Sequence, residues 1–298
     1  MLNKIKQIAK EFIINYYYGN KSIAFVNQEG ISEYNFIIGK ESSHSDGISA
    51  MLRVKNEETK IRACLSSIIG IFDEIIIIDN GSTDSTYAEV ERIMNDNKDY
   101  NIQLYSYPFA LAKIGKDNQA TSANSVHSLV YYSNWCISKC KKKWIFKWDG
   151  DMILPRSKRN IAIDLADSIR KSAPIFWNVK GQTVYLDGRG MPWAANNEIN
   201  EEERAFKNNS AFHFKKVGPW ERITCPFSMD EMYTKDVVFY ELKDSREDEF
   251  SHWSSLDDLT PRKKIEVNNY NLIKNTSEPS VNDFTCADPD DMYLVNSP

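Results

Sequence analysis

The sequence lacks any apolar stretch close to the about 20 residues that a helix needs to cross a bilayer, so we predict no membrane-spanning helix. Its five cysteines include no CxxC pair of the kind that binds zinc. Positive charge is not in excess either: the net charge is −5, whereas broad binding to a phosphate backbone requires a basic face. We therefore predict a cytoplasmic protein with reduced thiols and no nucleic-acid partner.

The chain does have the composition of an ordinary globular protein. Charged residues make up 27% and hydrophobic residues 42% of its 298 residues, which is typical of a soluble fold with a sizeable core. This length is enough for one large α/β domain with additions, or for two small domains.

The first 18 residues, MLNKIKQIAKEFIINYYY, predict an amphipathic helix. Its charges are scattered and no small-residue cleavage site follows it, so we do not expect a secretory signal. A short helix needs tertiary packing to persist, so we expect it to pack on the domain. The alternative is a basic helix that rests on an anionic membrane, at the inner face of the cell membrane. The apolar positions are Ile5, Ile8, Phe12, Ile13 and Tyr16, with Lys4, Lys6 and Lys10 elsewhere on the helix.

From residue 48 onward, predicted strands alternate with predicted helices. The unbroken run Ile75–Ile78 is typical of a parallel strand that is buried on both faces. This alternation predicts an α/β fold with a doubly wound, mostly parallel sheet and helices on both faces. The predicted strands lie at 48–54, 75–78, 102–107 and 144–148, and the predicted helices begin near 59 and span 85–96, 119–140 and 157–171.

The second half of the chain is less regular. A strand is predicted at 175–180 and a hairpin through 181–193, after which the pattern fades. The last stretch has little periodicity and is predicted to be an extension on the surface. The predicted divisions are 1–47 (a helix and two short strands), 48–253 (the main domain, with halves 48–155 and 156–253) and 254–298 (the extension).

Polar side chains follow three of the predicted strands. Asn56 and Glu57 follow the first, Asp79 follows the second, and Asp149 and Asp151 follow the fourth. Ligands of such sheets bind at the carboxyl ends of the strands. Two carboxylates as close as Asp149 and Asp151 repel each other, most strongly where the dielectric is low, so we expect a positive charge beside them.

Two stretches resemble a known family. The stretch AMLRVKNEETKIRACLSSIIGIFDEIIIIDNGSTDSTY resembles the opening of the family 2 glycosyltransferases of the GT-A fold: a strand, an Asn-Glu pair, a helix and a strand that ends in aspartate. The stretch NWCISKCKKKWIFKWDGDMIL resembles their next block, a helix that leads to a strand capped by an Asp-x-Asp motif. The likeness spans about residues 48–155, and three motifs in the expected order are more specific than any one of them.

The resemblance implies an α/β GT-A (Rossmann-like) fold and a nucleotide-sugar donor, with a UDP-sugar favoured. Asp79 corresponds to the family's aspartate that accepts an N–H of uracil, and Glu57 would line the same base pocket. Asp149 would hold the ribose. The donor-binding residues that the resemblance implies are Arg53, Asn56, Glu57, Asp79, Asn80, Gly81 and Asp149.

The resemblance also implies a divalent metal, Mn²⁺ or Mg²⁺, at the diphosphate. Such a cation prefers oxygen ligands and neutralises the charge that develops on the leaving group. Asp151 would bind it directly, Asp149 would bind it or a metal-bound water, and His252 would complete the shell. The alternative for His252 is a structural histidine whose hydrogen bonds are satisfied.

Inversion at the anomeric carbon requires a carboxylate that takes the proton of the acceptor. The stretch ERAFKNNSAFHFKKVGPWERI is similar to the family's RLFR…HE segment, with Arg204 near its start and Trp220 in place of the histidine. Glu221 is therefore the first candidate for the base. The alternatives are Asp230, Asp248 and Glu249.

The resemblance thus implies a metal-dependent, inverting glycosyltransferase that acts on a glycan or lipid-linked acceptor in bacterial surface-polysaccharide assembly. A sugar nucleotidyltransferase, the second enzyme class, would carry a Gly-rich loop after its first strand, and RVKNEETK has no glycine. The non-enzymatic alternative is a domain of this fold that binds a nucleotide or glycan without turnover.

Overall fold

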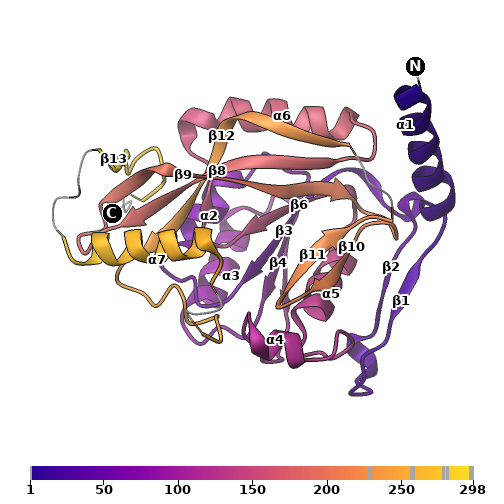
Figure 1. The fold of residues 1–298 in the computed structure, drawn as a ribbon, viewed down its shortest axis with the longest axis horizontal. Coiled ribbons are helices and arrows are strands. Elements are labelled where there is room, and N and C mark those ends of the chain that lie inside the picture. The colour runs from indigo at the N-terminus through magenta and orange to yellow at the C-terminus, as the bar shows by residue number, and fades with distance from the viewer. Residues whose placement is uncertain (1, 227–229, 256–258, 277–278, 280–281, 295–298) are drawn as a thin grey trace.

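The computed structural model describes residues 2–226, 230–255, 259–276, 279 and 282–294. Within this part of the chain nine strands form one curled sheet, and helices lie on both of its faces (Figure 1). Two small sheets, of two strands each, lie beside it. The fold is therefore mixed α/β, as predicted.

The strands of the large sheet are, in spatial order, β5 (Ile102–Ser106), β4 (Glu74–Asp79), β3 (Ser45–Val54), β6 (Lys142–Asp149), β9 (Pro192–Lys207), β8 (Phe176–Leu186), β12 (Glu231–Asp244) and β7 (Met152–Ile153), with β13 (Phe284–Cys286) paired to β9. The small sheets pair β1 (Ile23–Phe25) with β2 (Phe36–Ile38) and β10 (His213–Val217) with β11 (Trp220–Thr224). The α-helices are α1 (Leu2–Ile13), α2 (Ile61–Ile68), α3 (Thr86–Asp96), α4 (Lys116–Ala120), α5 (Leu129–Lys139), α6 (Arg159–Lys171) and α7 (Pro261–Lys274). Short helical turns of other types are η1 (Ile14–Tyr18), η2 (Ser32–Tyr34), η3 (Glu41–Ser43) and η4 (Arg156–Lys158).

The first half of the large sheet is parallel, as the sequence predicted. Strands β5, β4, β3 and β6 pair in parallel. On β4, Ile75 and Ile77 join a core cluster with α2, α3 and α6, whereas Ile76 and Ile78 join a second cluster with α5. This burial on both faces explains the unbroken run of isoleucines. The carboxyl ends of β3, β4 and β6 consequently meet at one edge of the sheet.

The second half of the sheet is also regular, so the prediction that regularity fades after the first hairpin is wrong. Strand β9 extends over 16 residues and pairs antiparallel with both β8 and β6. The consecutive glutamates 201–203 conceal it, because they interrupt the alternation of apolar and polar residues that marks a strand. Each of them pairs with a basic side chain instead, namely Lys180, Arg204 and Arg222 in turn.

The predicted helix over 119–140 is two helices. Helix α4 ends at Ala120 and α5 begins at Leu129. The stretch between them, TSANSVHS, is rich in residues whose side chains favour turns. Ser128 then caps α5, because its Oγ accepts a hydrogen bond from the N–H of Val130 at 3.2 Å. The local turn residues outweigh the helical periodicity here.

Helix α7 lies within the predicted surface extension. Its start is marked by Thr260, whose Oγ accepts a hydrogen bond from the N–H of Lys263 at 3.2 Å. Tyr270 and Ile273 are buried in a cluster with residues of β8 and β13. This part of the extension is therefore a helix docked on the second half of the sheet.

The expectation that the N-terminal helix packs on the domain is wrong for its described side chains. Ile8 and Phe12 on α1 are 57% and 63% exposed, whereas Ile14, in η1, is fully buried. Helix α1 stands away from the rest of the molecule (Figure 1). As far as the chain is described, no helix has the length and apolar character needed to cross a bilayer.

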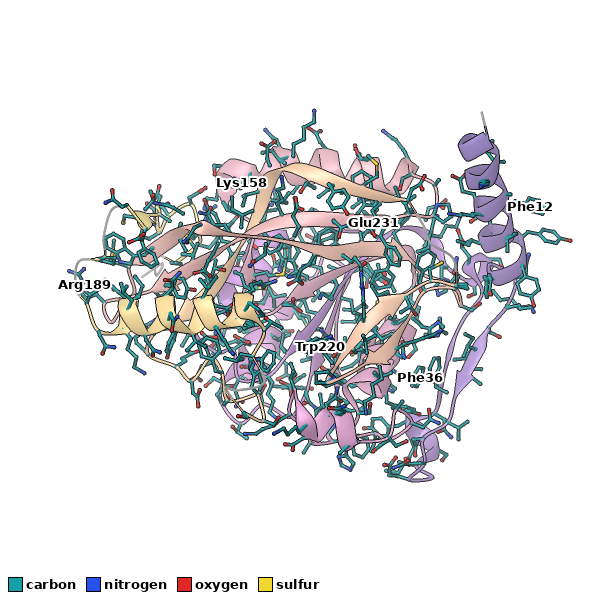
Figure 2. All side chains as sticks on the ribbon, in the orientation of Figure 1. Phe12, Phe36, Lys158, Arg189, Trp220 and Glu231 are labelled. Carbon is teal, nitrogen blue, oxygen red and sulfur yellow. The ribbon has the colours of Figure 1, made fainter. Side chains whose placement is uncertain are left out.

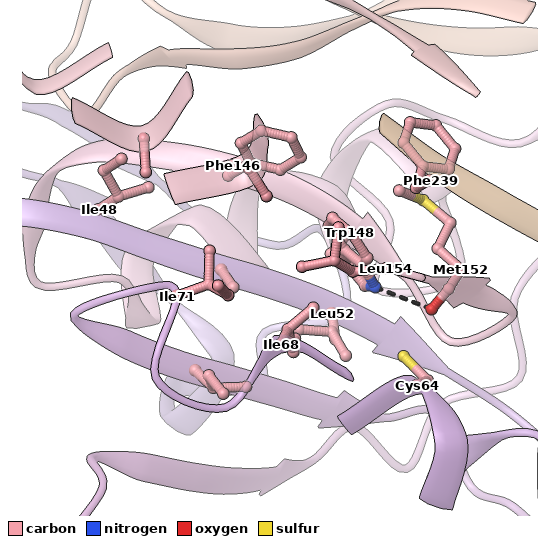
Figure 3. Close-up of a cluster of buried hydrophobic side chains, with 14 of the residues drawn as sticks. Ile48, Leu52, Cys64, Ile68, Ile71, Phe146, Trp148, Met152, Leu154 and Phe239 are labelled. Atoms are coloured by element: carbon pink, nitrogen blue, oxygen red, sulfur yellow. Dashed lines mark hydrogen bonds between the residues drawn. The ribbon is translucent and has the colours of Figure 1, made fainter. Parts of the chain in front are cut away.

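One core cluster lies between the parallel strands and the helices on one face, and it includes Phe146 and Trp148 of β6 (Figure 3). The ring of Phe146 lies 5.7 Å from that of Trp148 and 5.1 Å from that of Phe72. Trp148 Nε1 donates a hydrogen bond to the carbonyl of Met152 at 3.0 Å, which holds the turn after β6 against the core.

We expect Phe146→Ala to lower the free energy of unfolding by about 3–5 kcal/mol, because it removes a buried ring and leaves a cavity. Ile199→Ala is the matched control: Ile199 is 52% exposed on β9, and its loss should change stability by about 0.5 kcal/mol or less. Urea denaturation followed by circular dichroism measures both. Equal losses for the two variants would contradict this description of the core.

Candidate functional site

The loops that follow β3 and β4 are joined by hydrogen bonds. Asn56 has a φ of 56°, and its Oδ1 accepts from the N–H of Thr83 at 2.8 Å. Its own N–H donates to Ser82 Oγ at 2.9 Å. The N–H of Glu57 donates to Thr86 Oγ1 at 2.6 Å. The Asn-Glu pair and the NGSTDST stretch, two of the predicted motifs, therefore form one structural unit.

Asp79 and Asn80, at the end of β4, have different roles. Asn80 Nδ2 donates to the carbonyls of Tyr107 and Phe109 at 3.0 and 2.8 Å, so this side chain fixes the loop after β5. Asp79 Oδ2 accepts from the N–H of Ser82 at 3.1 Å. Asp79 Oδ1 is buried and has no hydrogen-bond partner among the described residues. A buried acceptor without a partner is costly, so Asp79 has the chemistry to receive a donor from a ligand.

Gly81 follows with a φ of 64°, a conformation that favours glycine, and nothing described lies within 4 Å of where its Cβ would be. The turn can therefore be approached closely from outside.

A cavity of about 720 Å³ opens at the carboxyl ends of these strands. Its wall comes from the loops that follow β3, β4, β5 and β12, together with the first turn of α5, the turn after β6 and the end of β12. The residues that contribute are 53–58, Lys60, Asn80, Asp84, 111–114, Leu129, Tyr132, Asp151, Lys243, 247–249, Ser251 and His252. Four of the predicted donor residues line the cavity, together with four of the predicted acid, base and metal candidates. The donor residues are Arg53, Asn56, Glu57 and Asn80, and the candidates are Asp151, Asp248, Glu249 and His252.

Asp149, the first acid of the Asp-x-Asp motif, is paired with arginines. Its Oδ2 accepts a hydrogen bond from Arg204 Nη1, and its Oδ1 lies 4.0 Å from Arg53 Nη2. Burial alone would raise the pKa of Asp149, but Arg204 and Lys147 hold it below its usual value. The carboxylate is therefore charged, and Arg204 already neutralises it.

Asp151, the second acid, is paired with a lysine. Lys243 Nζ on β12 lies 2.5 Å from Asp151 Oδ2 and 2.9 Å from Glu241 Oε1. Burial alone would lower the pKa of Lys243, but Asp151 and Glu241 raise it well above its usual value. The positive charge expected beside the two aspartates is thus supplied by the protein itself.

The three predicted metal ligands, Asp149, Asp151 and His252, do not fit a divalent cation in this arrangement. Among the described residues, no three His, Cys, Asp or Glu side chains come together as a ligand group. A divalent ion about 4 Å from Lys243 Nζ would be repelled by about 8 kcal/mol at an effective dielectric of about 20. The structure therefore does not form the metal site that the resemblance implies.

Lys60 lies at the centre of a second charged group in the same wall. Its Nζ is 3.1 Å from Glu57 Oε2, 3.1 Å from Glu247 Oε2 and 2.8 Å from Glu249 Oε1. Burial, together with the charges of Asp151 and Glu249, raises the pKa of Glu57 to about 8, although Lys60 opposes this. The effect of burial on the pKa of Glu57 therefore outweighs the attraction of Lys60.

The four candidate bases occupy different environments. Glu221 Oε1 accepts from Arg53 Nη1 at 2.8 Å and lines a separate cavity of about 290 Å³. Glu249 is engaged by Lys60. Asp230 is exposed and lines neither of these two cavities. Asp248 lines the large cavity; its Oδ1 accepts from the N–H of Phe250 at 3.3 Å, and its carboxylate forms no ion pair with a described residue.

His252 lines the cavity next to this group. Its backbone carbonyl accepts from the N–H of Ile114 at 2.9 Å, which ties the loop after β12 to the loop before α4. Desolvation and the charges of Lys243 and Lys263 lower the pKa of its imidazole to about 4, so the ring is neutral at pH 7.

Sequence reasoning missed Lys60 and Lys243 as members of this site. Lys243 lies 92 residues from its partner Asp151, in a strand that the sequence pattern did not mark. Lys60 belongs to the run KNEETK, whose charges are typical of a solvated loop. The separation of lysine from glutamate by three residues was a local signal for the Glu57–Lys60 pair.

Comparisons with known proteins agree with the motifs. Residues 49–123 match the family described as glycosyl transferase family 2. Over 51 residues the chain is 39% identical to an uncharacterized glycosyltransferase of Rickettsia conorii, and this match covers 17% of the chain and 18% of that protein. The chain thus spans less than a fifth of the length of the curated relative that it matches.

Two solved structures are similar at a lower level. S. aureus TarS is 14% identical, with a TM-score of 0.38 over 66% of this chain and 36% of that chain. The glucosyl-3-phosphoglycerate synthase of Mycobacterium tuberculosis, in complex with Mn²⁺, UDP and glucosyl-3-phosphoglycerate, is 20% identical, with a TM-score of 0.31 over 49% of this chain and 46% of that chain. At these TM-scores neither likeness carries an argument about substrate or metal.

The match to residues 49–123 begins on β3, contains the Asn-Glu pair and the whole of β4, and ends beyond α4. It therefore includes the first two of the three predicted motifs. Within its α/β fold the chain carries, at residues 49–123, a glycosyl transferase family 2 segment, and the resemblance inferred from its motifs is confirmed there.

Proposed function

We propose that this protein transfers a sugar from a nucleoside diphosphate sugar to a hydroxyl group of an acceptor. The observation that carries the proposal is the cavity of about 720 Å³ at the carboxyl ends of β3, β4 and β6. Ligands of open α/β sheets bind at this edge, and the volume is within the range of small-molecule sites. The family 2 segment supplies the loops after β3 and β4 and residues 111–114, all of which line the cavity.

The nucleotide base would lie over the end of β4. Asp79 Oδ1, buried and without a partner among the described residues, has the chemistry to accept an N–H from a base such as uracil. The backbone turn at Gly81 leaves room for a close approach. A uridine nucleotide is therefore the favoured donor.

The diphosphate would lie nearer the lysines of the cavity wall. Lys60 and Lys243 place two ammonium groups in this wall, and an ammonium group is a point-charge donor for phosphate oxygens. The raised pKa of Glu57 reduces the negative charge that this residue contributes beside the lysines. Both ammonium groups are ion-paired with carboxylates in the described structure, and they would stabilise the leaving diphosphate by sharing these contacts with its oxygens.

Asp248 is the carboxylate best placed to take the proton of the acceptor. In an inverting transfer the acceptor oxygen attacks the anomeric carbon, its proton passes to the base, and the bond between that carbon and the diphosphate oxygen breaks. Asp248 lines the cavity, whereas Glu221, the first candidate from the sequence, is held by Arg53 beside a different cavity. The assignment of the base therefore moves from Glu221 to Asp248.

The acceptor and the biological setting stay predictions. A glycan or lipid-linked acceptor, surface-polysaccharide assembly and a cytoplasmic location are implied by the resemblance alone. A binding protein of the same fold is the competing function, and it differs by binding the nucleotide without releasing a sugar from it.

Incubation with a panel of nucleoside diphosphate sugars tests the proposal. We expect a UDP-sugar to raise the melting temperature, because a ligand that binds only the folded state stabilises it, and we expect slow release of UDP without acceptor. Asp79→Asn should weaken donor binding by about tenfold, since it loses a charged acceptor for the base. Glu91→Gln, on the exposed face of α3, is the control and should bind as the parent does. Binding without any UDP release, with or without added Mn²⁺, would favour the binding protein.

Asp248→Asn and Glu221→Gln distinguish the two bases. We expect Asp248→Asn to lower kcat by about 10²–10⁴-fold with donor affinity unchanged, because it removes the proton acceptor and no donor contact. Glu221→Gln should cost far less in kcat, since this residue is paired with Arg53 outside the large cavity. Steady-state kinetics with the identified donor measure both. A larger loss of kcat in Glu221→Gln would return the role to Glu221.

Lys243→Met tests whether this lysine keeps a divalent cation away from Asp151. Without its ammonium group, Asp151 loses its ion pair and Glu241 loses the shortest of its ion pairs, so the two carboxylates attract a cation more strongly. We therefore expect Mn²⁺ to raise the melting temperature of Lys243→Met by several degrees and that of the parent by little. Lys113→Met, which also changes a lysine of the cavity wall, is the control. An equal Mn²⁺ shift in the parent would show that Lys243 does not block the site.

A further inference from the structure

The N-terminal segment presents an apolar surface that the rest of the described chain does not cover. The N-terminal patch, as we define it, comprises five residues of α1 and η1 that are at least 39% exposed. Their exposed fractions are 57% for Ile8, 63% for Phe12, 39% for Ile13, 67% for Tyr16 and 50% for Tyr17. Figure 2 shows Phe12 pointing away from the remainder of the molecule.

The patch is ordered by its own contacts. Ile8, Phe12 and Tyr16 follow one another at intervals of four residues and so share a helix face. The rings of Phe12 and Tyr16 are stacked, with centroids 5.3 Å apart, and Lys21 Nζ lies 3.5 Å from the centroid of the Tyr17 ring. These contacts form a continuous apolar and aromatic ridge with a cation at its edge.

The residues at the C-terminal end of the N-terminal patch are fixed to the body of the protein. Ile14 is fully buried in a core cluster with residues of β2 and α5. Ser210 Oγ donates to the carbonyl of Tyr18 at 3.1 Å, and the N–H of Glu41 donates to the carbonyl of Gly19 at 2.9 Å. The ridge is therefore held at one end of the molecule and projects from it (Figure 1).

The segment that carries the N-terminal patch has a positive net charge, whereas the whole chain has a negative one. Residues 1–22 contain four lysines and one glutamate, in a protein whose net charge is −5. The lysines are Lys4, Lys6, Lys10 and Lys21. Lysines on long, flexible stems beside an apolar face are typical of helices that lie at the surface of an anionic bilayer.

We propose that the N-terminal patch docks on an anionic lipid bilayer, with Phe12, Tyr16 and Tyr17 in the interfacial region and Lys6 and Lys21 at the headgroups. Tyrosine suits this position, because its ring is apolar and its hydroxyl remains in contact with water. A single short helix of this kind gives reversible attachment.

A second copy of the chain is a poorer occupant of the patch. A symmetric contact between two patches would bring their lysines close to one another, and like charges across an interface oppose association. Anionic headgroups complement the same lysines. The proposal goes beyond the sugar transfer inferred above and does not depend on it, because the patch shares no residue with the large cavity.

Sedimentation of the full chain with lipid vesicles tests the proposal. We expect the protein to sediment with vesicles that contain phosphatidylglycerol and to stay in solution with vesicles of phosphatidylcholine alone. The paired change Phe12→Glu and Tyr16→Glu should weaken binding by on the order of a hundredfold, since it places two carboxylates at the lipid face. Lys6→Glu with Lys21→Glu should weaken it by about tenfold or more, and added salt should weaken the binding of the parent.

Tyr100→Glu is the matched control, because Tyr100 is an aromatic residue that is 47% exposed in the loop before β5. It should bind vesicles as the parent does. Circular dichroism and the melting temperature establish that each variant is folded. Vesicle binding that is equal in all variants, or absent in the parent, would overturn the proposal. Analytical ultracentrifugation without lipid provides a second test. If the parent binds no vesicles but forms a dimer, and the paired change Phe12→Glu and Tyr16→Glu dissociates that dimer, then the patch binds a second copy of the chain. This result would also overturn the proposal.

Discussion

The neutralisation of the two carboxylates at the end of β6 is the interaction on which the rest of the structure depends. Asp149 and Asp151 stand where the parallel half of the sheet ends, and their cationic partners, Arg204 on β9 and Lys243 on β12, come from the other half. An unpaired charge in such a position would cost several kcal/mol. The pairs therefore fix how the second half of the sheet sits against the first, and they bring β12 and the loop after it to the cavity.

Asp149 and Asp151 already form ion pairs within the protein. The other charged side chains of the cavity wall therefore determine how the cavity can bind and react. Lys60 and Lys243 are ion-paired with carboxylates of the wall, and burial raises the pKa of Glu57. Asp248 has a carboxylate outside any ion pair among the described residues. Ion pairing also distinguishes the candidate bases from one another. A carboxylate held by an arginine is a structural partner first, whereas one that faces an open cavity is available for proton transfer.

The parallel half of the fold and the meeting of its motifs could be predicted because their signals are local. The run of isoleucines in β4 reports burial on both faces, and the polar residues after β3 and β4 report a shared edge. The partner of Asp151, Lys243, could not be predicted, because two residues 92 positions apart produce no periodic pattern in the sequence. Strand β9 was missed since its glutamates 201–203 are balanced by charges from elsewhere, and only the tertiary structure reveals them. The exposure of α1 was missed because helical spacing identifies an apolar face without identifying what covers it.

The N-terminal segment and the rest of the chain carry opposite net charges. The first 22 residues contribute +3 to the total of −5, so the remaining residues carry −8. An anionic surface attracts the first segment and repels the rest, and both forces act within about a Debye length of roughly 8–10 Å at moderate ionic strength. A rigid attachment at Ile14 and Tyr18 converts these opposed forces into a preferred orientation, with the ridge toward the surface and the acidic body away from it. The projection of α1 keeps this segment apart from the body, which carries the negative charge of the chain.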